Sequence, residues 1–444
     1  MEAVAGALYA ADNLLQGAAA LATGILYPTL PLKSNISHIT SVPIPISQHT
    51  ISVVKGRAYI FGGENAPGQL ANNDMHVVIL PSSGVLEADY TTISPRAAVA
   101  GGAVPAARKG HTAVVIGDTI YVFGGEGVPE PENGRVWAFS TVANSWSYLD
   151  PSPGTLFPSQ RTGHAAAGAD FPGPRDVVFK ERAPQQPADP AKAVPEPADD
   201  DSWGTLFVVG GKDVEKGELL NDALAFDIRT RMWSNVPSPP GQPREGASID
   251  VVGKRLYRFG GKGVETFASG GMDFVDVSPV WKHAEGGTTP LTTGWDWEEI
   301  RVGEGDAPQA RSSAGLVSVT TGQGRHYLLI IGGEGETSTF FDDIWSFQLP
   351  PEGYSAAAVK DQTRAAIKKD TYEGKWAELN YKFVDATGEE TKEIPGQPKR
   401  GLGIRGHFAA TKGTEVDGAS VVAWGGVDKD GKVLGDGWLI TVER

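Results

Sequence analysis

Six copies of one short pattern constrain the fold of this chain more than any other feature. Each copy is an apolar run that ends in Gly-Gly, and the first glycines are Gly62, Gly124, Gly210, Gly260, Gly332 and Gly425. The shortest spacing, from Gly210 to Gly260, is 50 residues. Repeats of about 20–50 residues form solenoids, propellers or arrays, in which each unit buries its apolar faces against its neighbours. The longer spacings are interpreted as the same unit with loop insertions.

Each repeat contains more than the two glycines. A run of small and aliphatic residues precedes Gly-Gly, and an alternating aromatic run follows it. The repeat closes on an aromatic residue with an aliphatic residue three positions later: Tyr90/Ile93, Trp146/Leu149, Trp233/Val236, Trp297/Ile300 and Trp376/Leu379. Alternation with a period of two is typical of strands that bury one or both faces. The sequence therefore predicts an all-β chain of six four-stranded units.

This combination resembles the kelch-repeat family, within the galactose-oxidase-like propellers, over about residues 36–442. The resemblance implies a six-bladed β-propeller, in which four strands make one blade. It also implies that peptides or small molecules bind at the mouth of the central funnel. Propellers serve as adaptors, enzymes and lectins alike, so the resemblance alone selects no function.

Only five closing pairs accompany the six Gly-Gly motifs, so the last blade lacks an outer strand. We expect Ile39–Val42, which Pro43 follows, to supply it, because an unpaired blade edge would be exposed to other chains. The expected organisation is residues 1–35 as an N-terminal helix and lead-in, and residues 36–444 as the propeller. Residues 36–42 form the expected closing strand.

Three insertions are expected to lie on one face of the disc. Residues 170–203 contain seven prolines and the acidic run Asp199–Asp201, a composition that cannot bury a core and predicts disorder. Residues 278–294 and 350–374 interrupt the fourth and fifth blades. The latter contains a predicted helix over Ser355–Lys369, with Ser355 as N-cap and apolar positions 356, 359 and 366/367 on one face.

The opposite face carries the candidate site, at the mouth of the funnel. The residues directly after Gly-Gly are expected to point into it: Glu64, Glu126, Lys212, Lys262, Glu334 and Val427. Arginines at the starts of blades approach the same mouth: Arg108, Arg161, Arg244 and Arg311, with Arg405 slightly out of register. These arginines either bind a carboxylate-bearing ligand or form ion pairs that hold the blades together. Both interpretations stay open at this point.

Candidate catalytic and metal sites are few. His49, His111, His164 and His407 recur at one motif position, one per blade, which indicates a structural role. The chain has no cysteine, which excludes the Cys–Tyr crosslink that the copper site of galactose oxidase requires. Nitrile-specifier-like kelch proteins use a Glu-x-x-x-Asp-x-x-x-His iron site, but here Glu218 and Asp222 are followed by Phe226. We expect no cofactor, no metal and no catalytic triad.

The charge and the N-terminal segment bear on partners and compartment. A net charge of −15 disfavours nucleic acid and anionic membranes as partners. Residues 1–27 are apolar but lack the basic start of a secretory signal, so a cytoplasmic location is expected, with secretion left open. The function expected is a binding module that engages a protein or peptide through the funnel face. The alternative is an enzyme of the cofactor-independent lyase or isomerase type, acting on a small molecule in the funnel.

Overall fold

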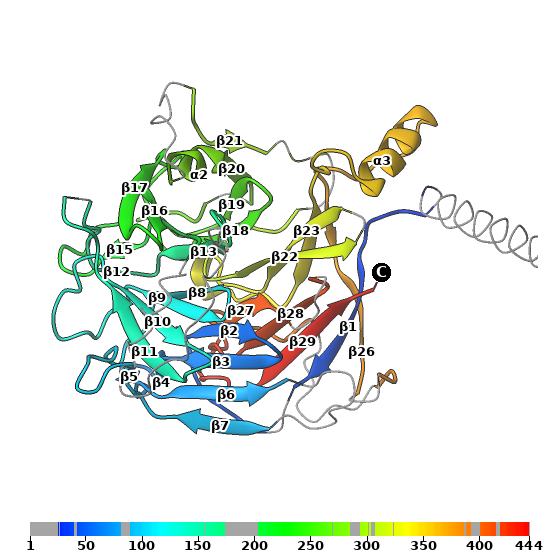
Figure 1. Cartoon of the computed structure of the whole chain (residues 1–444). Helices are drawn as coiled ribbons and strands as arrows, with labels where there is room; N and C mark the ends of the chain where they lie inside the picture. The colour runs from blue at the N-terminus through cyan, green and yellow to red at the C-terminus, as the bar shows by residue number, and fades with distance from the viewer. Residues whose placement is uncertain are drawn as a thin grey trace, which may run out of the picture.

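The computed structural model describes Ile25 and residues 27–39, 42–80, 89–154, 156–173, 203–268, 270–284, 294–300, 302, 307–322, 324–385, 388–391, 400–413 and 418–443. Six sheets, antiparallel except for one strand pair in blade six, surround one axis and form the predicted six-bladed β-propeller (Figure 1). Most of the expected N-terminal helix and most of the proline-rich insertion lie outside the described residues. No helix in the described ranges is both long enough and apolar enough to cross a membrane.

The first three blades each order their strands from the axis outwards along the chain. Blade one contains β2 (Thr50–Val54), β3 (Arg57–Phe61), β6 (Met75–Ile79) and β7 (Tyr90–Ile93). Blade two contains β8 (Thr112–Ile116), β9 (Thr119–Phe123), β10 (Val136–Ser140) and β11 (Ser145–Leu149). Blade three contains β13 (Ala165–Ala169), β14 (Thr205–Val209), β16 (Ala223–Asp227) and β17 (Met232–Val236). Two small two-stranded sheets accompany the blades: β4 (Glu64–Ala66) with β5 (Gln69–Leu70), and β12 (Arg161–Thr162) with β15 (Lys212–Asp213).

The remaining blades follow the same order. Blade four contains β18 (Ser248–Val252), β19 (Arg255–Phe259), β20 (Met272–Asp276) and β21 (Glu298–Glu299). Blade five contains β22 (Gly315–Gly322), β23 (Arg325–Ile331), β24 (Ile344–Gln348) and β25 (Trp376–Glu378). Blade six contains β27 (Ala409–Lys412), β28 (Ser420–Trp424) and β29 (Gly437–Val442), and it is completed by a strand from the N-terminal end of the chain.

The tryptophans of the outer strands pack between blades, as their spacing indicates. Trp146 lies 5.0 Å from Phe61 of blade one and 5.0 Å from Phe139 of its own blade, measured between ring centroids. Trp233 and Trp376 bridge the next blade pairs in the same way. Large aromatic rings bury much apolar area, so each of these contacts ties two neighbouring sheets together.

The Gly-Gly motif lets the next blade approach closely. Gly124 has a φ of 67°, and a Cβ atom there would lie 2.7 Å from both the carbonyl oxygen of Arg161 and the Cε1 atom of His164. Only glycine combines this left-handed backbone with such a close approach. The motif therefore marks where the start of one blade packs on the second strand of the blade before it.

An N-terminal strand closes the ring, which confirms the predicted mode of closure. This strand, β1 (Lys33–His38), pairs with β29 in the register Ser34↔Val442 to His38↔Trp438. It begins and ends earlier than the expected segment 36–42, and the amides of Ile44 and Ile46 donate instead to the carbonyl oxygens of Gly435 and Leu434, which precede β29. A further strand, β26 (Asn380–Phe383), pairs with β1 in parallel and makes the sheet five-stranded.

The insertion in blade five forms the helix α3 (Ala356–Ala366), which stands out from the disc (Figure 1). Ser355 caps it as predicted, since its hydroxyl accepts a hydrogen bond of 3.1 Å from the amide of Ala358. The predicted apolar face is wrong: Val359 and Ile367 are each 52% exposed, whereas Asp361 and Arg364 are buried. The short helix α2 (Ser278–Ala284) lies in the insertion of blade four.

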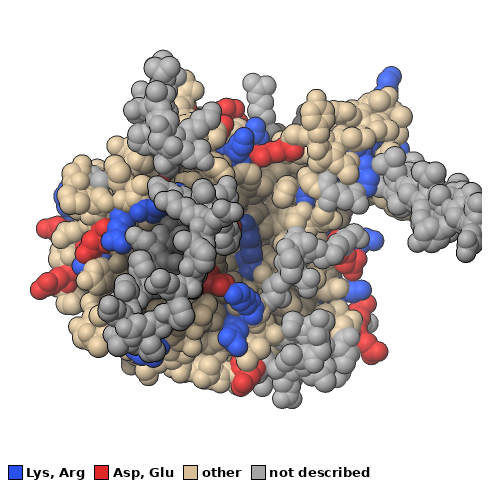
Figure 2. Space-filling view, in the orientation of Figure 1, with Lys and Arg blue, Asp and Glu red and all other residues tan. Residues whose placement is uncertain are grey.

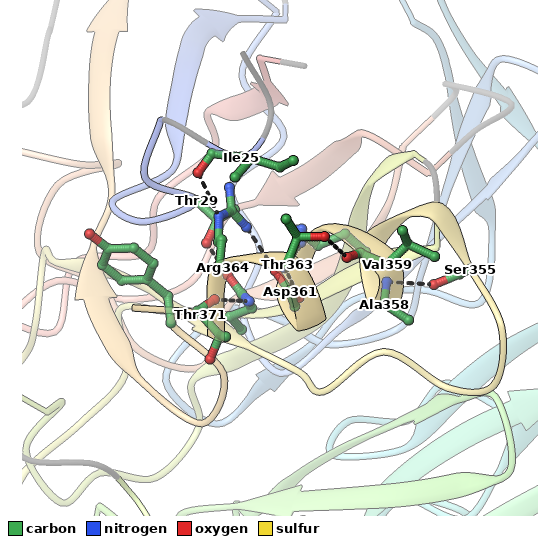
Figure 3. A network of polar contacts seen from close by, with 12 residues as sticks. Ile25, Thr29, Ser355, Ala358, Val359, Asp361, Thr363, Arg364 and Thr371 are labelled. Atoms are coloured by element: carbon green, nitrogen blue, oxygen red, sulfur yellow. Dashed lines mark hydrogen bonds and ion pairs between the residues drawn. The ribbon is translucent and has the colours of Figure 1, made fainter. Parts of the chain in front are cut away.

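The buried face of α3 holds the lead-in to β1 (Figure 3). The Arg364 guanidinium donates to the carbonyl oxygens of Ile25 and Tyr27, at 3.3 and 2.8 Å. It also pairs with Asp361, which accepts two hydrogen bonds from Arg325 of β23. Polar contacts, rather than an apolar stripe, therefore fix the helix and the N-terminal segment to each other.

Candidate functional site

The inner strands of all six blades line a channel with a volume of about 990 Å³. Its wall consists mainly of small and β-branched residues, as is required where six strands converge on one axis. The Gly-Gly motifs all lie at one end of this channel, because each ends the second strand of its blade. That end is called the mouth below, and its face of the disc the Gly-Gly face.

The residues after Gly-Gly lie beside the segments that start their blades. Each forms an isolated antiparallel bridge, or a two-residue ladder, with the segment that starts its blade: Ser47↔Glu64, Lys109↔Glu126, Thr162↔Lys212, Glu245↔Lys262, Ser312↔Glu334 and Gly406↔Val427. Glu126, Lys212, Lys262 and Glu334 line the channel, whereas Glu64 is only 7% exposed. The mouth also contains Lys109 and Glu245, which the sequence analysis missed although each directly follows a motif arginine.

The mouth is electrostatically mixed. The Lys109 ammonium lies 2.9 Å from a carboxylate oxygen of Glu64 and 3.4 Å from one of Glu126. Burial opposes its charge, but the hydrogen bond and charge of Glu64 outweigh burial and raise the pKa of Lys109. A hydrogen bond from His407, at 3.4 Å, lowers the pKa of Glu334. Across the face visible in Figure 2, basic and acidic side chains are also interspersed.

Four of the five motif arginines are not available to a ligand. Their side chains are 0–3% exposed. Each donates to the carbonyl oxygen of the first glycine of its own Gly-Gly motif and pairs with a carboxylate of its own blade: Arg108 with Gly124 and Glu132, Arg161 with Gly210 and Asp222, Arg311 with Gly332 and Asp343, and Arg405 with Gly425 and Asp436. These four therefore stabilise the motif itself, and the alternative in which they bind a ligand is corrected. The fifth, Arg244, differs and is considered below.

The register of blade six also corrects the histidine set. Because Gly406 pairs with Val427 as Lys109 pairs with Glu126, Arg405 is in register with Arg108. His407 then occupies the position of Gly110, with a φ of 54°, and Phe408 occupies the position of His111. Matching by residue type alone aligns His407 with His111, which misplaces the register of blade six by one residue.

The three remaining histidines of the set, His49, His111 and His164, lie between neighbouring blades. The His111 Nε2 atom lies 3.0 Å from the hydroxyl of Thr50 in blade one, and the His164 Nε2 atom lies 2.8 Å from that of Thr112 in blade two. Burial lowers the pKa of His164 to about 3 and that of His111 well below its usual value. These imidazoles are therefore neutral at ordinary pH and serve as blade-to-blade contacts.

His49 occupies the same place at the seam between blades six and one, but it lacks such a partner. Both of its ring nitrogens are buried without a hydrogen bond, and burial lowers its pKa to about 3. Ala409 stands where Thr50 and Thr112 stand in the other blades. The seam at which the ring closes is therefore one hydrogen bond short.

The residues that resemble an iron site do not assemble. Asp222 accepts both hydrogen bonds from Arg161, and Phe226 is fully buried in the core. Among the described residues, no group of three or more histidines and carboxylates is arranged to hold a metal ion.

Comparison with known proteins places this architecture in a family. The profile described as the KLHDC2/KLHL20/DRC7 Kelch-repeats domain matches residues 32–171 and 186–371. This chain is a kelch-repeat protein. Its solved structural neighbour YjhT superposes with a TM-score of 0.51 at 14% identity, covering 91% of this chain and 99% of that one, a likeness that concerns the fold.

Curated relatives of this kelch protein differ in length. N-(sulfonatooxy)prop-2-enimidothioate sulfolyase of Thlaspi arvense is 24% identical over 362 residues, which are 69% of this chain and 94% of the relative. Host cell factor 2 of Homo sapiens is 26% identical over 58% of this chain and 28% of its own length. Rho GTPase-activating protein gacHH of Dictyostelium discoideum is 37% identical over 122 residues, 26% of this chain and 7% of its own length. The chain thus spans only a small part of several relatives.

Proposed function

We propose that this kelch propeller is a binding module that engages a protein or peptide through its Gly-Gly face. The observation that carries the proposal is the mouth: blades two to five place charged side chains of both signs around an open channel of about 990 Å³. Lys212 and Lys262 are exposed there. Among the described residues, no carboxylate lies within ion-pair distance of either ammonium group.

A mixed rim around a preformed hollow suits a polar segment of a partner. Charged groups at an interface contribute more to partner selection and association rate than to affinity. Reversing the charge of the exposed lysines should therefore weaken binding of a partner whose acidic side chains meet them. The buried arginines support the mouth from beneath, which keeps the rim in one geometry.

The test selects binders from a displayed random-peptide library and measures them against matched double variants. Lys212→Glu/Lys262→Glu reverses two charges at the mouth, and Arg57→Glu/Lys254→Glu reverses two on the opposite face. We expect the mouth variant to lose at least tenfold in affinity for the selected peptides and the control variant to bind like the wild type. Equal losses in both variants, or none in either, would reject the mouth as the binding surface.

A lyase is the second candidate, because the sulfolyase of Thlaspi arvense aligns along 94% of its own length with this chain. The channel is large enough for a small substrate, and the mixed rim could stabilise developing charge. Incubation with N-(sulfonatooxy)prop-2-enimidothioate tests this candidate. Turnover that the mouth variant loses and the control variant retains would favour the lyase, and absence of turnover would leave the binding module.

A further inference from the structure

Arg244 differs from the other four motif arginines. It occupies the same place at the start of blade four and donates to the carbonyl oxygens of Gly260, at 2.9 Å, and Pro240, at 3.1 Å. In the part of the chain that the structure describes, however, no carboxylate lies within ion-pair distance of it. Its side chain is half-buried, whereas the other four are fully buried.

One residue accounts for the absence of a carboxylate partner for Arg244. In blades three, five and six the acid is the residue directly before the third strand: Asp222, Asp343 and Asp436. In blade four the residue directly before β20 is Gly271. Blade two reaches the same result with Glu132, which lies farther from its third strand. Among the described residues, blade four is thus the blade with a motif arginine and no acid of its own paired with it.

Arg244 and Gly271 both line a second cavity of about 460 Å³, called the blade-four pocket here. Phe267, Met272 and Trp297 contribute apolar wall to it. The pocket opens between the loop that starts blade four and the loop after its Gly-Gly motif, so it lies on the Gly-Gly face. A cavity therefore lies where the carboxylate of the other blades would be.

Asp273, the acid whose charge acts on Arg244, is already paired with another arginine. Asp273 accepts two hydrogen bonds from Arg258, at 2.9 and 2.6 Å, and Arg258 also shares the Pro240 carbonyl oxygen with Arg244. Burial, and then the charge of Arg258, lower the pKa of Arg244 to about 10, and Asp273 opposes this only in part. The guanidinium is therefore a cation that lacks a counter-ion, beside a second cation. Glu299 lines the same pocket and is exposed.

We propose that the blade-four pocket binds a carboxylate on an apolar stem, which takes the place that Asp222, Asp343 and Asp436 take in their own blades. The carboxylate pairs with the Arg244 guanidinium in the bidentate manner of the other arginines, and the stem packs on Phe267 and Trp297. Its source is either a small organic acid or a glutamate side chain of a protein partner. The pocket and the channel share no lining residue, but the Lys262 ammonium of the mouth lies 5.3 Å from the centre of the Phe267 ring. The pocket is therefore tested against Lys212, the other exposed lysine of the mouth.

The first experiment measures binding of 3-phenylpropionate to the full chain by titration calorimetry, with the neutral 3-phenylpropanamide as the matched probe. We expect the carboxylate to bind at least tenfold more tightly than the amide, because a neutral amide cannot replace an anion beside Arg244. Arg244→Met should reduce carboxylate binding at least tenfold, whereas Lys254→Met should not change it. Equal binding of the two probes, or unchanged binding by Arg244→Met, would overturn the proposal.

Gly271→Asp provides a test that does not remove the arginine. This variant restores the acid of the other blades, so it should abolish carboxylate binding and raise the melting temperature. The rise should vanish in an Arg244→Met background, which links it to the new ion pair. Glu299→Gln should tighten binding, since it removes a like charge from the pocket. Carboxylate binding that persists in Gly271→Asp would place the ligand elsewhere and overturn the site.

The two sources are then distinguished with N-acetylglutamate methylamide, which carries a glutamate side chain between blocked peptide bonds. Tighter binding of this compound than of 3-phenylpropionate indicates a protein partner, and the reverse order indicates a small organic acid. Lys212→Glu serves as the control for the channel: it should weaken peptide binding at the mouth and leave carboxylate binding at Arg244 unchanged. Failure of one proposal therefore leaves the other testable.

Discussion

The seam between blades six and one should become more stable when Ala409 is replaced by threonine. The Nε2 atom of His49 is buried there without a partner. In the next two seams a threonine hydroxyl lies 3.0 and 2.8 Å from the equivalent atom of His111 and His164. Ala409→Thr places the same hydroxyl in the same register of an inner strand, where a β-branched residue is readily accommodated.

The expected gain is that of one buried hydrogen bond. A net contribution of about 1 kcal/mol is usual, and relief of an unsatisfied buried group adds up to about 1–3 kcal/mol. The reverse change, Thr112→Ala, should cost a similar amount, since it leaves His164 in the present state of His49. Two opposite changes of one size at equivalent positions would show that the hydroxyl, and not the added volume, is responsible.

Guanidinium denaturation of the full chain measures these free energies of unfolding. The control is His49→Phe, because Phe408 already fills this position in blade six against the glycine of blade five. Ala409→Thr should stabilise the wild type but not the His49→Phe variant, which has no ring nitrogen to satisfy. An equal gain in both backgrounds, or a loss in the wild type, would refute the assignment of His49 as the unsatisfied group of this seam.

Three further predictions follow from the contacts described. First, the pKa values of His49 and His164 lie near 3 in the folded chain, so the unfolded chain binds protons first as pH falls below about 6.5. The free energy of unfolding should then decline by up to about 1.4 kcal/mol per pH unit for each buried histidine. Denaturation curves that do not change between pH 7 and pH 5 would contradict this. Second, Arg311→Met removes the guanidinium partner of Asp343, a nearly buried carboxylate that then keeps a hydrogen bond from the indole of Trp345, so it should cost about 3–5 kcal/mol, whereas the pair Arg311→Met/Asp343→Leu should cost less. An Arg311→Met variant that melts like the wild type would show that the pair is not structural. Third, removal of residues 1–24 should leave a ring whose melting temperature is close to that of the full chain, whereas removal of residues 1–38 deletes β1 and should give an aggregating chain. A soluble 1–38 deletion with an unchanged melting temperature would reject closure by β1.

The repeat was predictable because its physical requirements are local. Gly-Gly at a close approach, the alternation of aromatic residues, and a tryptophan three positions before an aliphatic residue each appear within a few neighbouring residues. The five predicted outer strands match β7, β11, β17, β21 and β25. The closing strand was placed a few residues late, although the alternation of Leu30, Leu32 and Ile36, all buried, marks the strand that forms.

The site was less predictable because the role of each side chain depends on partners that are far away in the chain. Arg108 and Arg244 occur in similar sequence contexts, but only Arg108 has a carboxylate partner, Glu132. The residue directly before the third strand of blade four is Gly271, which cannot pair with Arg244. The face of α3 was misjudged for the same reason: Asp361 and Arg364 are buried because Arg325 and the carbonyl oxygens of Ile25 and Tyr27 meet them. Periodicity within the helix contains no information about those partners.

Closure by β1 also sets an order of events during synthesis. The strand emerges from the ribosome before the other strands of the propeller, yet its antiparallel partner β29 emerges after them, roughly 400 residues later. Blades one to five can form as they are translated, while β1 waits for β26 and then for its antiparallel partner β29, and an unpaired strand is a hazard for association between nascent chains. Formation of the propeller therefore ends with a ring-closing step, and its rate determines how long each new molecule exposes an open blade to its neighbours on the same messenger RNA.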